Sequence, residues 1–132
     1  MKPDPVIWFE IYVQDLERAT KFYETVLQLK LEPLGDPNNG DMKMMAFPMT
    51  MGAPGASGAL VKKDGCPSGP GGTLIYFACD DVAVESARIE SAGGKLFKEK
   101  MDIGEYGAIA LGFDTDGNMF GLHNPPSGAQ SG

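Results

Sequence analysis

The chain has 132 residues, enough for one domain of ordinary size, and its hydrophobic fraction of 42% allows a packed core. Eighteen acidic against eleven basic residues give a net charge of −7, which argues against nucleic acid or an anionic membrane as partner, because both attract clustered Lys and Arg. No apolar run approaches the roughly 20 residues that span a bilayer. Residues 1–5 carry an acidic residue and two prolines where a signal peptide would be apolar. With only two cysteines, Cys66 and Cys79, we expect a cytoplasmic protein.

The first half of the sequence predicts a strand, a helix and three short strands. The strand covers Val6–Val13, which is apolar and aromatic almost throughout. Asp15 is placed to cap a helix over Asp15–Leu27, whose apolar residues recur at spacings of three and four. Turns rich in Gly, Pro and Asn, the first at 36–40, separate the short strands that follow. These strands are expected at Leu29–Leu34, Met42–Phe47 and Ala56–Lys62.

The second half repeats this order. Asp81 is placed to cap a helix that runs to Ala92, where Gly93 provides a left-handed stop. The two capping aspartates lie 66 residues apart, which is half of the chain. We therefore expect two modules, about 6–62 and 73–125, joined by a linker at 63–72 and followed by a tail at 126–132, within a single domain. The strands of the second module are expected at Thr73–Cys79, Lys95–Lys100, Tyr106–Phe113 and Asn118–His123, with a tight hairpin turn at Asp116-Gly117.

Two stretches resemble the vicinal oxygen chelate superfamily, also called the glyoxalase, bleomycin resistance protein and dioxygenase superfamily. The stretch Phe9–Ala19, followed by Phe22-Tyr23, is similar to the strand, aspartate and helix that open the family's module. Asp114–Asn118, leading into Gly121-Leu122-His123, is similar to its closing hairpin. The resemblance covers about residues 6–125. It implies an α+β fold of tandem βαβββ modules, whose curved mixed sheets enclose a concave ligand cavity.

The resemblance also indicates where a metal would be bound. Members with glyoxalase-type or dioxygenase-type chemistry hold a divalent ion with His, Glu or Gln side chains on four strands. The matching positions in this sequence are occupied by side chains that do not bind such ions. They are Trp8, Ala59, Leu74 and Gly121. We therefore expect no metal site and no cofactor.

Strand alternation indicates what lines the cavity instead, if the resemblance sets which faces point inward. Side chains two apart share a face, so Trp8, Glu10 and Tyr12 point together. Burying an unpaired carboxylate costs several kcal/mol, so Glu10 must be paired, protonated or open to a cavity. The same alternation groups Leu74, Tyr76 and Ala78, and Met119, Gly121 and His123.

We expect Glu10 and His123 to be the catalytic candidates, although either could instead have a purely structural role. Ligand-binding roles are expected for Trp8, Tyr12, Tyr76 and Met119, which could equally belong to the core. Cys79 is followed by two aspartates that would raise the pKa of its thiol, so it is not expected to act as a nucleophile.

Three functions compete. The first is a binding protein that encloses a small molecule without a metal, either sequestering it or acting on it; negative charge and aromatics favour a flat or cationic guest. The second is an isomerase or lyase, related to lactoylglutathione lyase, with Glu10 as base and His123 as acid. The third keeps a metal in an irregular site, for which one carboxylate and one imidazole are too few ligands. Exposed sheet edges also predict a homodimer.

Overall fold

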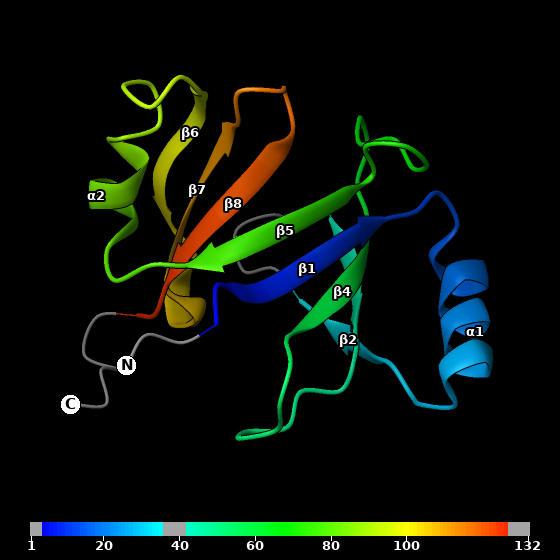
Figure 1. The fold of residues 1–132 in the computed structure, drawn as a ribbon. Helices are drawn as coiled ribbons and strands as arrows, with labels where there is room; N and C mark the ends of the chain where they lie inside the picture. The colour runs from blue at the N-terminus through cyan, green and yellow to red at the C-terminus, as the bar shows by residue number, and fades with distance from the viewer. Residues whose placement is uncertain (1–3, 36–41, 127–132) are drawn as a thin grey trace. The chain divides into compact units, whose positions relative to one another are not determined.

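The computed structural model of the chain describes residues 4–35 and 42–126 (Figure 1). These residues fold as two compact units. The N-terminal unit comprises residues 8–35 and 42–74, and the C-terminal unit comprises residues 75–126 together with residues 4–7. The α+β class and the twofold βαβββ order predicted from the sequence are confirmed. The turn expected at 36–40 and the tail beyond 126 lie outside the described residues.

The N-terminal unit forms a four-stranded mixed sheet with one helix. Its strands follow the order β2-β3-β4-β1, in which β1 runs parallel to β4 and the other neighbours are antiparallel. The elements are β1 (Val6–Tyr12), α1 (Leu16–Leu27), β2 (Glu32–Leu34), β3 (Lys43–Ala46) and β4 (Ser57–Lys62).

Local hydrogen bonds explain where α1 begins and ends. The Asp15 carboxylate accepts a hydrogen bond from the Arg18 amide at 3.0 Å, which satisfies one of the free amides of the first turn. Gln28 ends the helix in the left-handed conformation with φ 54°. Glu24 then accepts a hydrogen bond from the amide of Leu31, which returns the chain to the sheet. Side chains of α1 pack on a core around Leu31, Phe47 and Leu60.

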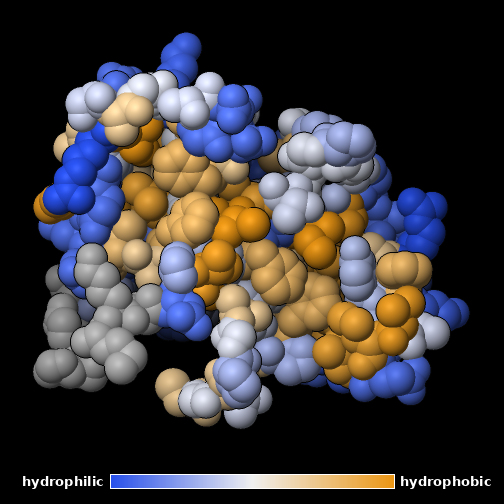
Figure 2. All heavy atoms as spheres, viewed as in Figure 1, coloured by the Kyte–Doolittle hydropathy of each residue, from blue (hydrophilic) through white to orange (hydrophobic). Residues whose placement is uncertain are grey.

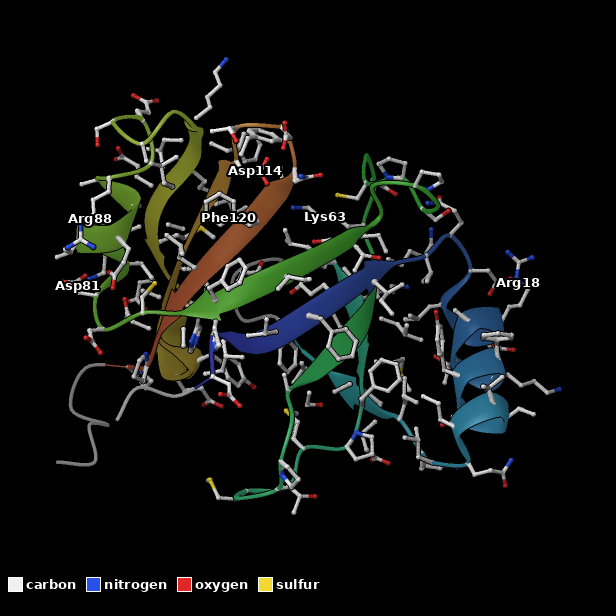
Figure 3. The ribbon with its side chains drawn as sticks, viewed as in Figure 1. Arg18, Lys63, Asp81, Arg88, Asp114 and Phe120 are labelled. Atoms are coloured by element: carbon white, nitrogen blue, oxygen red, sulfur yellow. The ribbon has the colours of Figure 1, made fainter. Side chains whose placement is uncertain are left out.

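The C-terminal unit repeats the architecture, with strands in the order β5-β8-β7-β6 and β5 parallel to β8. Its core joins Val82 of the helix to Ala110 and Leu122 of the sheet, and Phe120 (labelled in Figure 3) packs against Phe77. The elements are β5 (Thr73–Ala78), α2 (Val82–Ser86), β6 (Lys95–Asp102), the 3-10 turn η1 (Gly104–Tyr106), β7 (Ala108–Phe113) and β8 (Met119–Asn124).

Helix α2 begins as predicted but ends earlier. Asp81 (Figure 3) accepts hydrogen bonds from the Ala83 amide and from Lys100, and these hold the pKa of its carboxyl below the usual value. Beyond Ser86 most of the bonds connect residues three apart, as from the Ile89 amide to the Ser86 carbonyl, so much of the chain there winds in tighter turns. The helix expected to reach Ala92 was therefore too long, because these turns keep Ile89 buried against the sheet.

Several strand limits also differ from the prediction: most shift by one residue, and β6 runs on to Asp102 instead of ending at Lys100. Tyr106 lies in η1 rather than at the start of a strand, and only Glu32–Leu34 of the expected Leu29–Leu34 strand pairs with β3. The hairpin turn before β8 is confirmed, since the Asp114 carboxylate accepts bonds from the amides of Asp116 and Asn118. No helix among the described residues is long and apolar enough to cross a membrane.

Candidate functional site

The predicted group Trp8, Glu10 and Tyr12 is assembled on one face of β1. The residues between them, Phe9 and Ile11, point the opposite way and pack in the core beneath α1. The face that bears Glu10 is therefore the face of the N-terminal sheet that α1 leaves free. On this face the cross-strand neighbours of the three residues are Ser57, Ala59 and Val61 of β4.

Hydrogen bonds hold the Glu10 carboxylate from both sides. The indole N–H of Trp8 donates to Oε2 at 3.2 Å, and the hydroxyl of Tyr12 donates to Oε1 at 2.8 Å. Glu10 is only 8% exposed, whereas the two aromatic residues are half-buried. Neutral donors at both oxygens stabilise the ionised carboxylate and fix its plane. The group is thus an oriented carboxylate between two aromatic side chains, suited to a hydrogen-bond donor or a cation.

The remaining predicted residues share a face of the C-terminal sheet. Tyr76 lies opposite Gly121, His123 lies opposite Ala78, and Met119 begins β8 opposite Phe113. The residues that alternate with them along β5 and β8 point to the opposite face and pack towards α2; Phe77 and Leu122 are examples. Each unit therefore brings its own candidates together. The cavity that would unite the two groups stays a prediction.

His123 is held in one tautomer by the turn before β7. Its Nε2 lies 2.7 Å from the carbonyl oxygen of Tyr106, which can only accept, so Nε2 carries the proton of the neutral ring. Its Nδ1 is buried and has no hydrogen-bond partner among the described residues. The neutral ring thus offers an acceptor, and a role as acid would first require protonation at Nδ1. Sequence reasoning missed the Tyr106 carbonyl, because its position depends on η1.

Cys79 lies where its thiol is kept protonated. Burial, followed by the negative charge of Glu85, raises the pKa of Cys79 to about 11, and Asp80 adds a smaller contribution. The predicted direction is correct, but burial outweighs the neighbouring aspartates on which the prediction relied. A thiol with this pKa is a poor nucleophile at neutral pH.

The residues at the positions matched to the family's metal ligands do not fit a divalent metal ion. Within residues 4–35 and 42–126, no group of three or more His, Cys, Asp or Glu side chains is arranged to hold one. A Cβ atom built on Gly121 would overlap the ring of Tyr76, so an aromatic side chain fills the space that a ligand at this position would need. The four positions matched to the family's ligands still hold Trp8, Ala59, Leu74 and Gly121.

Comparisons with known proteins agree with this architecture. The sequence profile of the family described as "Glyoxalase/Bleomycin resistance protein/Dioxygenase superfamily" matches residues 6–122. The anthracycline biosynthesis protein DnrV of Streptomyces peucetius is 25% identical over 128 residues, and the putative glyoxylase CFP32 of Mycobacterium bovis is 26% identical over 120. Both alignments cover 91% of this chain but only 46% and 44% of the relatives. The chain thus spans about half the length of these curated relatives.

Solved structures show the same fold at low identity. A hypothetical protein, BH1468, from Bacillus halodurans C-125 superposes with a TM-score of 0.70 at 14% identity, over 96% of this chain and 97% of that one. Methylmalonyl-CoA epimerase from Mycobacterium tuberculosis superposes with a TM-score of 0.68 at 17% identity, over 93% of this chain and 89% of that one. At such identities the likeness shows the fold alone.

Proposed function

Because the chain belongs to the glyoxalase, bleomycin resistance protein and dioxygenase superfamily, we propose that it binds a small molecule without a metal, at the face of β1 that bears Glu10. The observation that carries this proposal is the pair of hydrogen bonds that orient the Glu10 carboxylate between Trp8 and Tyr12. With both oxygens engaged in hydrogen bonds, the carboxylate is held in one orientation. The arrangement therefore favours holding a guest over abstracting a proton.

A flat cationic molecule fits these groups best. The rings of Trp8 and Tyr12 offer negative π-faces, and the carboxylate between them supplies a full charge at a site that is largely removed from water. The net charge of −7 adds a long-range attraction for cations. The relative DnrV is named for anthracycline biosynthesis, and an anthracycline with an amino sugar is a flat cation, so this class of compound belongs in the first test.

Calorimetric titration with a panel of flat cations and neutral analogues of the same shape tests the proposal. We expect Glu10→Gln to weaken cation binding by about tenfold or more, because charge-assisted contacts are worth roughly 1.5–3 kcal/mol. Glu32→Gln is the matched control, since it removes the same charge from an exposed position on β2. An equal loss in both variants, or no loss in Glu10→Gln, would refute a specific role for Glu10.

An isomerase or lyase activity is the second candidate. It is supported by the buried Nδ1 of His123, which is a second basic group, and by the relative CFP32, which is named a putative glyoxylase. In this case Glu10 would act as base, with His123 assisting after protonation. A turnover assay over a panel of thiol adducts and 2-oxo acids tests it. Activity that Glu10→Gln and His123→Asn each abolish would favour the enzyme over the binding protein.

We also propose that the protein is a cytoplasmic homodimer. The location is supported by Cys66 and Cys79, which are both free thiols. Self-association is supported by the large apolar side chains that the isolated chain exposes, such as Phe22, Val26 and Met51. Sedimentation equilibrium at micromolar concentration tests the dimer, and a mass that stays near 14.1 kDa would refute it.

A further inference from the structure

One segment of this acidic chain carries no charge. The eighteen residues 44–61, which cover β3 without Lys43, β4 without Lys62 and the loop between them, contain no Asp, Glu, Lys, Arg or His. Elsewhere charges are frequent, since 22% of the whole chain is Asp, Glu, Lys or Arg. Two copies with a net charge of −7 each repel one another, and a surface without charges is where that repulsion is least.

An apolar hollow lies beside this segment. It has a volume of about 340 Å³ and opens on the N-terminal unit between the sheet and α1, where Figure 2 shows apolar side chains gathered. The hydroxyl of Ser57, one of its few polar groups, already donates to the carbonyl oxygen of Pro48 at 2.9 Å. The hollow therefore suits an apolar side chain rather than a polar ligand. It is lined by Phe9, Ile11, Tyr23, Leu27, Leu29, Phe47, Pro48, Ala56 and Ser57.

The loop between β3 and β4 carries a fully exposed apolar side chain, and both ends of the loop line the hollow. Every residue from 48 to 56 is exposed, and Met51 at its tip is 99% exposed. The loop runs from Phe47 to Ala56, and these two residues and Pro48 also line the hollow. A methionine fully in water and an apolar hollow thus lie within one short segment. Methionine is unbranched and flexible, so it adapts well to such a space.

We infer that the N-terminal unit docks on a second copy of this chain by inserting Met51 of each copy into the hollow of the other. A two-fold axis makes the same patch serve both copies, and a loop whose two ends line the hollow can take part in such an exchange. The rim residues Val26 and Leu27 of α1, which are 59% and 51% exposed, would be covered as well. The inference rests on the proposed homodimer and names its interface. It is independent of the ligand proposed for Glu10.

Sedimentation equilibrium of Met51→Asp over a concentration series is the first test. We expect the dissociation constant of the dimer to rise by about a hundredfold. Because of the two-fold symmetry, one new carboxylate from each copy would be buried in the interface, and each would add to the repulsion between two negatively charged chains. Val84→Asp is the matched control, since it places the same charge on an exposed apolar residue of α2 and should leave the constant unchanged. A dimer that Met51→Asp leaves intact would overturn the interface but not the homodimer, whereas a monomeric wild type would overturn both.

Disulfide trapping distinguishes docking between copies from closure of the loop within one copy. Met51→Cys and Leu27→Cys are made as separate proteins, each with Cys66→Ser to remove a free thiol. We expect a disulfide-linked dimer when the two proteins are mixed and oxidised, and much less with Leu27→Cys alone. If the mixture stays unlinked while the double variant forms a disulfide within one chain, the loop covers its own hollow and the inference is wrong.

Discussion

The hydroxyl of Tyr12 lies 2.8 Å from a carboxylate oxygen of Glu10, two residues earlier on the same strand. An alternating strand face has thus placed a donor beside the acid without any contribution from loops. The Trp8 indole completes the arrangement from the other side, at 3.2 Å. Both of these contacts therefore come from side chains of β1 itself.

We predict that Glu10→Gln leaves the melting temperature unchanged or raises it. The amide oxygen can accept from Trp8, and the amide NH₂ can donate to the Tyr12 hydroxyl, which can also accept, so both hydrogen bonds survive. Removing a charge that is only 8% exposed also lessens the desolvation penalty. Thermal unfolding followed by circular dichroism measures the effect.

Glu10→Leu is the contrasting variant. It leaves the Trp8 N–H without its acceptor, so we expect a loss of about 1–3 kcal/mol in the free energy of unfolding. If Glu10→Gln were as destabilising as Glu10→Leu while cation binding stayed unchanged, Glu10 would be a structural residue.

Gly121→Ala should destabilise the protein by about 1–3 kcal/mol, because the added methyl group would overlap the ring of Tyr76. In a Tyr76→Ala background the same substitution should cost little, since the ring is gone. A double-mutant cycle measured by urea unfolding reports this coupling. Gly35→Ala is the control, because nothing lies within 4 Å of a Cβ atom there. Additive effects of Gly121→Ala and Tyr76→Ala would disprove the overlap.

The purified protein should contain no stoichiometric nickel, zinc or iron, and a chelator should leave its melting temperature unchanged. The reasons are that Trp8, Ala59 and Leu74 offer no metal ligand and that the Tyr76 ring lies over Gly121. Elemental analysis by mass spectrometry gives the metal content. One tightly held equivalent would show that the four positions were assigned wrongly.

The rate at which iodoacetamide alkylates Cys79 should be low at neutral pH and should rise as the pH is raised. The pKa of Cys79 is about 11 instead of the usual 9.0, so at pH 8 the fraction of its thiol that is ionised is about a hundred times smaller than in an ordinary cysteine. Its labelling by iodoacetamide should be slower by the same factor. Because the folded-state pKa is raised, the rate should climb until the pH passes about 11. Glu85→Gln should speed labelling, since it removes the second cause of the shift.

Cys66→Ser isolates the signal of Cys79, and unfolding in urea should restore ordinary reactivity. Mass spectrometry counts the labels. Rapid labelling of folded Cys66→Ser at pH 8 would contradict the protected environment described for Cys79.

Helix α1 and the face of β1 could be predicted from the sequence because both depend on neighbours in the chain. Asp15 caps the next turn, and alternation alone brings Glu10 and Tyr12 together. The end of α2 could not be predicted, since it follows from how Ile89 packs on the sheet. The carbonyl partner of His123 also escaped prediction, because it depends on the 3-10 turn at Tyr106. Local periodicity does not encode these long-range contacts.

The parallel pairing of β1 with β4 has a consequence for how the chain folds. Trp8 meets Ser57, about fifty residues later, and the C-terminal unit closes a similar loop between Tyr76 and Gly121. Each sheet therefore needs a long loop closure before its first strand gains a partner, which places the protein among slow-folding topologies. During synthesis, the strand that bears Glu10 waits without its partner until β4 has left the ribosome.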